Sequence, residues 1–335
     1  MAYFSAAANN VTSSTGLSHL ASVYYKKKGL DRLQKKFVFR DACVDDMLPK
    51  QVGRTVQFYR YSNLSAVTSN NTEGTVGTPI SISSRTVSAT VSQYTSFITL
   101  SDLVVDTAID PIVQNAAELL GYQGGLTVDT ITRNIIDAEY VNSTTSPGQA
   151  MLGGTIRVAD FRSARHQLQA NDVQPFDNGE FLAYASPFVT YDLVNDPAAN
   201  GYADITKYTA PQNSALVKYE DRGLVTSIAG CRLIESTNVK KTAGTPNLYR
   251  VYIFGKGAVG AVDLEGRGPN KVSDPTKQRF KINIIKGQPS IPDPEGVIGA
   301  AVSYNFIYSV VVLDGPATIG GQYRYRMIDA SSSIG

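Results

Sequence analysis

The stretch "TVQFYRYSNLSAVTSNNTEG", residues 55–74, begins with the alternation of a β-strand and ends as a polar loop. Val56 and Phe58 alternate with more polar neighbours, and a second alternating stretch, "TVSATVSQYTSFITL", follows at residues 86–100. Because successive side chains of a strand point to opposite faces, the two stretches predict a two-stranded arm. About twelve outgoing residues would extend this arm by roughly 40 Å.

The arm has little apolar surface that its own chain could bury. Small polar side chains fill most of one face, and the turn-forming residues Gly74, Gly77 and Pro79 lie near the tip. An isolated hairpin is only marginally stable in water. We therefore predict that the arm lies on another chain rather than mainly on its own.

The composition favours a protein with sizeable buried cores and no dedicated nucleic-acid-binding role. The 335 residues are 42% hydrophobic and 18% charged, with a net charge of +2. Cys43 and Cys231 are far apart and lack metal-ligand spacing, which excludes a disulfide scaffold and favours a reducing compartment. No apolar stretch approaches the roughly 18 residues of a membrane helix, and the start lacks the pattern of a signal peptide. We predict no membrane segment.

Residues 16–40 are predicted to form a basic helix, because apolar residues recur there at helical spacing. Between residues 26 and 40, seven lysines and arginines stand against one acid, Asp31, which is the strongest charge asymmetry in the chain. Two interpretations remain open: a solvated face, or contact with acidic surfaces or packaged nucleic acid.

Residues 111–139 are predicted to form a long helix. Asp110 is a suitable N-cap, and Pro111 occupies the first helical position. The helix would be over roughly 40 Å long. Gly124 and Gly125 cost up to about 2 kcal/mol relative to alanine, so we predict close backbone packing at Gly124 on the apolar face. The opposite, polar face is predicted to carry Gln114, Asn115, Glu118, Asp129, Thr132 and Arg133.

Residues 155–270 mix helix and strand patterns without a strict βαβ period, which predicts an α+β fold. A helix is predicted over 158–172, with Phe161, Ala164 and Leu168 on one side. Strands are predicted within "GEFLAYAS" (179–186), "CRLIEST" (231–237), "YRVYIFG" (249–255), "VIGAAVSYNFIYSVVVL" (297–313) and "GQYRYRMID" (321–329).

The sequence predicts neither an enzyme nor a cofactor or metal site. His19 and His166 both point away from their local apolar stripes, and no histidine or cysteine pair has zinc spacing. There is no G-x-S-x-G nucleophile motif. "GKGAVG", residues 255–260, matches G-x-G-x-x-G, but the next residues, "AVDLEG" (261–266), do not open the helix that would bind pyrophosphate. We predict a glycine-rich turn between strands.

The order of these segments resembles the Hong Kong 97-type fold of tailed-phage major capsid proteins, and more narrowly the major capsid family of the coliphage N-four group. The resemblance covers most of the chain. Its segments are "YYKKKGLDRLQKKFVF" (24–39), "LPKQVGRTVQFYRYSNL" (48–64), "ITLSDLVVDTAIDPIVQNAAELLG" (98–121), "FGKGAVGAVDLEG" (254–266) and "SDPTKQR" (273–279).

The resemblance implies five parts. They are an N-terminal arm (1–50), an extended β-hairpin E-loop (51–100), a peripheral domain with a long spine helix (101–154), an α/β axial domain (155–285) and strands that return to the peripheral domain (286–335).

The resemblance also implies a structural function. Hexamers and pentamers would assemble in the bacterial host cytoplasm into the icosahedral head of a virion, which encloses double-stranded DNA without sequence-specific binding. Only about fifty residues precede the arm, too few for a fused scaffolding domain, so scaffolding would be a separate protein. The portal is a further implied partner, and decoration proteins could be added. Residues 51–206 contain no lysine, which removes the E-loop lysine that some relatives use for covalent crosslinks. We therefore expect noncovalent assembly.

The arm is basic, with a single acid, Glu73, near its tip. An arginine can bind a carboxylate through two hydrogen bonds, so arm arginines are expected to pair with acids on a neighbour's spine helix or peripheral domain. The predicted contact residues are Arg54, Arg60, Arg85, Tyr59 and Tyr61 on the arm and Glu118, Asp129 and Asp137 on the neighbour.

Three alternatives remain. An encapsulin-like nanocompartment shares the fold but encloses enzymes, so its contents would distinguish it. An adhesin or tail component would fit the Ser/Thr-rich middle, although the long helix and the lack of repeats oppose it. An enzyme is the least favoured of the three.

Overall fold

The computed structural model describes residues 38–332, apart from residues 69–72, 75, 78, 109–110, 142–148, 152–153, 196–216, 221–222, 245, 266–280, 287–297 and 314–322. The basic helix predicted over residues 16–40 therefore lies almost entirely outside the described residues, as do His19 and Asp110. Its last residues enter a 3-10 turn, η3 (Phe39–Ala42).

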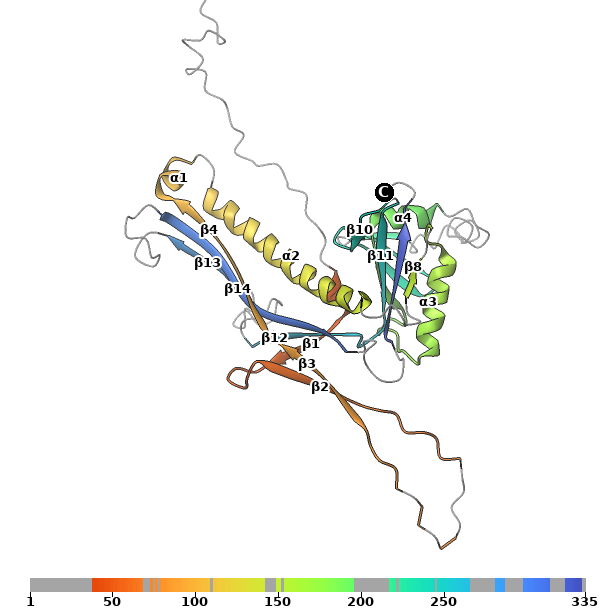
Figure 1. The fold of residues 1–335 in the computed structure, drawn as a ribbon. Helices are drawn as coiled ribbons and strands as arrows, with labels where there is room; N and C mark the ends of the chain where they lie inside the picture. The colour runs from red at the N-terminus through yellow and green to blue at the C-terminus, as the bar shows by residue number, and fades with distance from the viewer. Residues whose placement is uncertain are drawn as a thin grey trace, which may run out of the picture.

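A long, narrow sheet forms one half of the molecule (Figure 1). Its central strand, β14, alternates between buried and half-buried side chains along its whole length, as expected for a strand that is covered fully on one face only. The strands are β1 (Cys43–Leu48), β4 (Ser92–Ser101), β12 (Val259–Leu264), β13 (Lys281–Lys286) and β14 (Ile298–Val312). Their order is β1-β12-β14-β13, and β4 also pairs with β14.

The predicted long helix is confirmed as α2 (Ile112–Val141), which follows the short α1 (Asp102–Thr107). It lies along the buried face of the long sheet (Figure 1). Leu120 and Ile136 join the buried cluster that contains Phe306 and other side chains of β14. Gly124 is buried, as its place on the apolar face predicts.

The predicted polar face of α2 is wrong at two positions. Asp129 and Thr132 are buried, whereas Leu119 is 49% exposed. Both polar side chains have hydrogen-bond partners inside the subunit, which makes their burial tolerable. Thr132 Oγ1 lies 2.9 Å from the carbonyl oxygen of Val128, one turn earlier in the helix. It also lies 2.9 Å from Tyr308 Oη, and this hydrogen bond connects α2 to β14.

The second half of the molecule is an eight-stranded mixed sheet with helices, so the predicted α+β class is confirmed. Phe161, Ala164 and Leu168 of the predicted helix are buried together in its core. The helices are α3 (Val158–Ala170) and α4 (Pro187–Val194). The strands are β5 (Gln149–Met151), β6 (Phe181–Ala185), β7 (Val217–Glu220), β8 (Gly223–Ile228), β9 (Cys231–Glu235), β10 (Lys241–Thr242), β11 (Leu248–Phe254) and β15 (Tyr325–Ser331).

The "GKGAVG" segment is confirmed as a turn between strands, and it joins the two sheets. β11 before it belongs to the eight-stranded sheet, and β12 after it belongs to the long sheet. Gly257 has a φ of +76°, a left-handed conformation that favours glycine. The motif therefore has a structural role at the junction.

The expected division of the chain needs two corrections. Of the two closing strands, β14 lies in the long sheet, but β15 lies between β5 and β11 in the other sheet. Its side chains are buried throughout, which only a central position in a covered sheet allows. Conversely, β12 lies within residues 155–285 and β13 crosses the end of that range, yet both belong to the long sheet.

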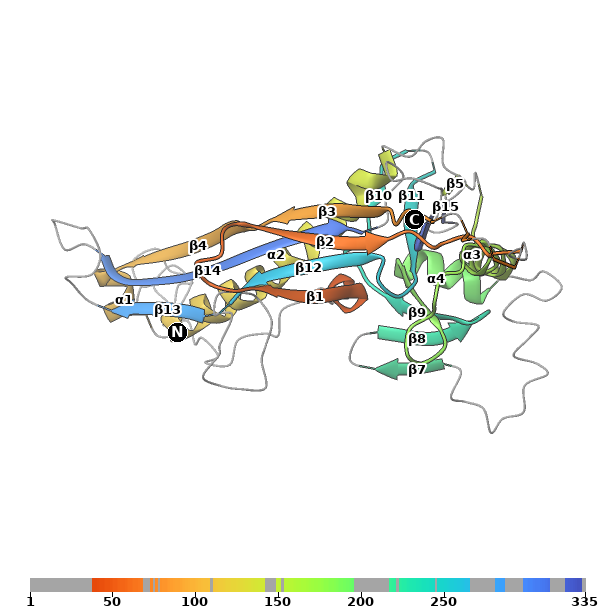
Figure 2. The ribbon, with the colours of Figure 1, turned by 90° about the horizontal axis from the view of Figure 1, so that it is seen from below.

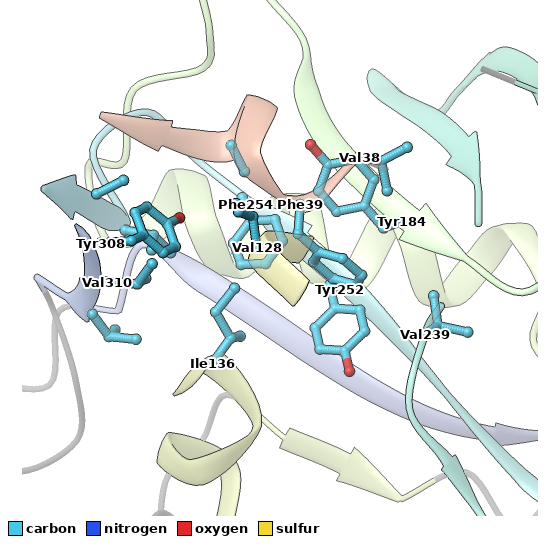
Figure 3. Packing of buried hydrophobic residues seen from close by; sticks show 14 of the residues in the cluster. Val38, Phe39, Val128, Ile136, Tyr184, Val239, Tyr252, Phe254, Tyr308 and Val310 are labelled. Atoms are coloured by element: carbon cyan, nitrogen blue, oxygen red, sulfur yellow. The ribbon is translucent and has the colours of Figure 1, made fainter. Parts of the chain in front are cut away.

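An aromatic cluster joins the two halves (Figure 3). Phe39 packs on Tyr184 and Tyr252, with ring centroids 5.3 and 5.1 Å apart. Val128 and Ile136 of α2 belong to the same cluster. The start of the described chain, the long helix and the eight-stranded sheet thus share one core.

Candidate interaction surface

The predicted arm exists, but its return strand is shorter than expected. β2 (Thr55–Tyr61) pairs with β3 (Ser84–Thr90) in an antiparallel ladder. The stretch 86–100 was expected to form one strand of the arm, and this is wrong. The chain leaves the arm at Val91 and continues as β4, which pairs with β14 of the same subunit.

The root of the arm, which is the β2–β3 pair, packs on its own subunit through one face. Val56, Phe58 and Ala89 contact a small apolar cluster that includes Ile307 and Val311. The pair therefore lies on the face of the long sheet opposite α2, and Figure 2 shows it running along β12 and β14. The prediction that the arm lies on another chain is thus restricted to the part beyond this root.

Beyond the root the arm extends away from the body of the subunit (Figure 1). The described residues between 62 and 83 are exposed and have no regular secondary structure apart from a turn at 73–74. The Ser62 amide donates to the Ser83 carbonyl at 3.0 Å, so the two limbs start side by side. The exposed apolar side chains of this segment, which we call the outer arm, are Leu64, Val67, Val76, Ile80 and Ile82, with exposed fractions of 58% to 100%.

The predicted contact residues of the arm divide between its two faces. Arg54, Tyr59 and Tyr61 are exposed. Arg60 and Arg85 are half-buried on the face that packs on the subunit, and Arg85 Nη2 donates to the Leu313 carbonyl at 3.0 Å.

For two of the three predicted acidic partners the prediction is wrong, because they are buried inside their own subunit. Glu118 is exposed on α2, but Asp129 and Asp137 are 1% and 7% exposed and bind groups of their own chain. A carboxylate that already satisfies buried donors is not available to a neighbour's arginine. Both residues instead hold the subunit together.

Asp137 belongs to a buried charge network between α2, β11 and β15. Arg250 binds Asp329 through two hydrogen bonds, Nε to Oδ1 at 2.7 Å and Nη2 to Oδ2 at 2.9 Å. Its Nη1 donates to Asp137 Oδ1 at 3.0 Å, and the Tyr252 hydroxyl donates to the same oxygen at 2.7 Å. Burial lowers the pKa of Arg250, but the neighbouring Asp329 and Asp137 raise it by more than burial lowers it. The guanidinium is therefore charged.

Asp129 binds the start of the described chain to α2. Its Oδ1 accepts the backbone amides of Val38 and Phe39, each at 2.9 Å, and its Oδ2 accepts Nδ2 of Asn238 at 2.7 Å. Burial raises the pKa of the Asp129 carboxyl, and these hydrogen bonds offset part of that shift. Sequence reasoning missed this role because the partners lie about a hundred residues away.

We expect Asp129→Ala to lower the free energy of unfolding by about 3 kcal/mol, because three buried donors lose their acceptor. Urea unfolding of the isolated subunit measures this change. The matched control is Asp45→Ala, which removes a half-exposed carboxylate 2.8 Å from Arg40 and should cost less than about 1 kcal/mol. Equal losses of unfolding free energy in the two variants would contradict the role of Asp129 in binding the start of the described chain to α2.

The described residues contain no group of three or more His, Cys, Asp and Glu side chains that could hold a metal ion. His166 is exposed, as predicted. Burial raises the pKa of the Cys43 and Cys231 thiols to about 12, far from the reactive range. In this part of the chain no helix is long and apolar enough to cross a membrane.

No protein-family model and no curated protein sequence matches the chain. Solved structures do match it. The capsid protein of the cyanophage P-SCSP1u superposes with a TM-score of 0.66 at 16% identity, covering 99% of this chain and 100% of that one. The chain has the fold of phage capsid proteins.

Two further capsid structures support the same assignment of the fold. The capsid of Ralstonia phage GP4 gives a TM-score of 0.66 at 12% identity, over 97% of this chain and 99% of that one. The mature capsid of bacteriophage PhiM1 gives 0.60 at 14% identity, over 92% of each chain. The capsid fold thus accounts for both sheets, the long helix and the arm together.

Proposed function

We propose that this protein is the major capsid protein of a tailed phage, of the Hong Kong 97 type and close to the coliphage N-four group. The observation that carries the proposal is the outer arm, an extended segment with exposed apolar side chains that the subunit itself does not cover. The capsid fold of the matching structures supports it.

In this proposal the long sheet with α2 is the peripheral domain, and α2 is its spine helix. The eight-stranded sheet with α3 and α4 is the axial domain. Residues 1–50 are the N-terminal arm and residues 51–91 the E-loop, which ends where β4 joins the long sheet. The axial domains of neighbouring subunits meet at the centres of hexamers and pentamers.

The outer arm lies across a neighbouring subunit. Burying its apolar side chains there would contribute about 1.5 kcal/mol or more for each one that is fully covered. Tyr59 and Tyr61, on the exposed face of the root, belong to the same contact. Because every subunit carries the arm and the surface that receives it, the contact repeats around each ring.

The protein acts as a structural component of the virion and not as an enzyme. It assembles in the bacterial cytoplasm with separate scaffolding and portal proteins, to which decoration proteins could be added. The shell encloses double-stranded DNA without reading its sequence. The basic segment at residues 26–40 is available for contacts with acidic surfaces or with the packaged DNA.

The function is tested by expressing the protein with its scaffolding protein and sedimenting the lysate. The proposal predicts closed shells far heavier than the subunit. Soluble monomers as the only product would contradict it. Shells purified from infected cells should contain genomic DNA, whereas enclosed enzymes would point to a nanocompartment instead.

Assembly is expected to be noncovalent, because residues 51–206 lack lysine and both cysteine thiols are shielded. Mature particles boiled in denaturant with a reducing agent should therefore give a single band near 36.1 kDa on a gel. A ladder at multiples of this mass would contradict the prediction.

A further inference from the structure

The strand β4 forms one edge of the long sheet (Figure 2). In the part of the chain that the structure describes, β14 is its only ladder partner. Hydrogen-bonded positions alternate along an antiparallel pair, so about half of the ten residues of β4 direct their N–H and C=O groups to the free edge. Such a row of unpaired backbone groups is a template for another strand.

The free edge of β4 lacks the features that usually protect the edge of a sheet. Its sequence, SQYTSFITLS, contains no charged residue, proline or glycine. Among the other described edge strands, β1 contains two aspartates, β13 two lysines, and β2, β3, β7 and β10 at least one charged residue each. β5 is uncharged but has only three residues. Proteins blunt free edges with charges, prolines or short strands, so a long uncharged edge indicates pairing with another chain.

An exposed aromatic side chain marks one face of this edge. Phe97, in the middle of β4, is 70% exposed and lies opposite Ser303 of β14. The adjacent Ile98 packs on the buried cluster of α2, so Phe97 lies on the face of the sheet away from that helix. Thr95 and Thr99 are exposed on the same face. A strand added at the edge would cover Phe97, and β-branched side chains are favourable cross-strand partners of an aromatic ring.

The outer arm contains a segment with the pattern of a strand but without a sheet. Residues 79–83, Pro-Ile-Ser-Ile-Ser, alternate between apolar and polar side chains, yet they are exposed and have no regular secondary structure. Ile80 and Ile82 are 58% and 72% exposed. A proline suits the first position of a strand, and isoleucine is among the residues that favour strands.

The free edge of β4 and residues 79–83 lie on opposite sides of the root of the arm. From the root, β4 runs along the long sheet, whereas the outer arm runs the other way, out from the body of the subunit (Figure 1). A second copy of the chain carries both features. A contact between two copies would therefore give the strand pattern a sheet and the free edge a partner.

We propose that residues 79–83 of one subunit add as a further strand to the free edge of β4 in a second copy, with Ile80 and Ile82 on the face of Phe97. Main-chain hydrogen bonds give such a contact its strength, and alternate side chains fix its register. Each subunit gives one strand and receives one, so the contact is heterologous, the type from which closed rings are built. The inference rests on the proposed shell-forming function and names the surface that receives the arm.

Disulfide crosslinking in assembled shells tests the pairing. Two versions of the chain are co-expressed, one with Ile82→Cys and the other with a single added cysteine on β4. Facing residues of paired strands have Cβ atoms about 4.5–5.5 Å apart, which a small adjustment brings to disulfide distance. After mild oxidation, a non-reducing gel measures the linked dimer. Shells of the chain without added cysteines give the background from Cys43 and Cys231.

The crosslinks should follow the two-residue period of a strand. Because successive side chains point to opposite faces, the strongest of Thr95→Cys, Phe97→Cys and Thr99→Cys should give at least about tenfold more linked dimer than Ser96→Cys. Tyr191→Cys, at a half-exposed position on α4, is the control outside the long sheet and should give only background. Equal linking at residues 96 and 97 would contradict the proposed face.

A lysine on the edge provides a second test. Phe97→Lys should lower the yield of sedimenting shells at least about tenfold, because a charge on an edge strand opposes the addition of another strand. The Tm of the isolated subunit should not change, because the ring is mostly exposed there. Phe97→Tyr keeps the ring and should leave the yield of shells close to that of the wild type. A lower Tm together with the loss of shells would show that Phe97 serves the subunit's own fold, and it would overturn its role in the contact.

The remaining outcomes are also decisive. If wild-type shells form and no cysteine on β4 links to Ile82→Cys above background, the inference fails and the proposed function stands. Linked dimers in shells that carry Phe97→Cys alone would mean that β4 pairs with β4 of a second copy. Linking to Leu64→Cys in place of Ile82→Cys would assign the contact to the other limb of the outer arm. Either result would overturn the proposal, whereas absence of wild-type shells would overturn the proposed function.

Discussion

Replacing residues 62–83 by an Asn-Gly turn is expected to abolish shell formation and to leave a folded subunit. The last ladder pair of the root, Tyr61 and Ser84, can be closed by a two-residue turn of this kind. The removed segment carries the exposed apolar side chains of the outer arm, which a neighbour covers in the proposed shell, so the subunit would lose those contacts. Because each 1.4 kcal/mol changes an equilibrium tenfold, losing two or more such contacts should lower shell yield more than about 100-fold.

The deletion is measured by sedimentation of the particles and by circular dichroism and Tm of the subunit. A milder variant, Val67→Ser with Ile80→Ser and Ile82→Ser, keeps the length of the arm and should lower the yield in the same direction. Ser65→Ala with Ser81→Ala changes the same limbs without removing apolar area and serves as its control. Normal shells from the deleted chain would show that the outer arm makes no essential contact.

Arg250→Met is expected to be the most destabilising single substitution in the subunit's core. It leaves the Asp329 carboxylate buried without its cation, and it leaves Asp137 with Arg133 alone, whose Nε lies 3.8 Å from Asp137 Oδ2. Removing one partner of a buried ion pair typically costs about 3–5 kcal/mol, because the remaining charge is not compensated. The free energy of unfolding in urea should fall by that amount, and little soluble subunit should accumulate.

Removing the whole network should cost much less than removing its centre. Adding Asp137→Leu, Asp329→Leu and Tyr252→Phe to Arg250→Met eliminates the uncompensated groups and should recover most of the lost stability. The surface pair of Lys256 and Asp177 offers a control, because Lys256→Met removes a half-exposed partner and should cost at most about 1 kcal/mol. If Arg250→Met were no worse than this control, the network would not hold α2 to the eight-stranded sheet.

The helices α2 and α3 and about half of the strands could be predicted from local patterns alone, whereas the short helices α1 and α4 were not predicted. α2 begins at the expected position after a proline, and α3 buries the three residues that its period marks. Where a segment's own periodicity decides which face is buried, the sequence carries enough information.

The split of the return strand is also marked in the sequence, although the alternation of the whole stretch hides it. Its apolar residues occupy odd positions through Val87, Ala89 and Val91, and even positions at Ile98 and Leu100. A shift of one residue moves side chains to the other face of a strand, so this change of phase signals a change of partner sheet. The structure places the break at Val91, whose amide donates to the Arg54 carbonyl.

The burial of Thr132 could be predicted from the sequence, whereas that of Asp129 could not. Thr132 lies four residues after Val128 and four before Ile136, so it continues the buried stripe of α2. Asp129 has no such local signal, because its burial depends on the amides of Val38 and Phe39 and on Asn238. The same is true of Asp137, whose partner Arg250 is 113 residues away. Contacts of this kind follow from the tertiary fold alone.

A cryo-electron-microscopy reconstruction of the assembled protein decides whether the outer arm joins subunits, because the area that this segment buries can be divided between its own chain and its neighbours. We expect an icosahedral shell of hexamers and pentamers in which residues 62–83 bury most of their area on a neighbouring subunit. A shell in which the outer arm packs mainly on its own chain, or an assembly of another kind, would contradict this expectation.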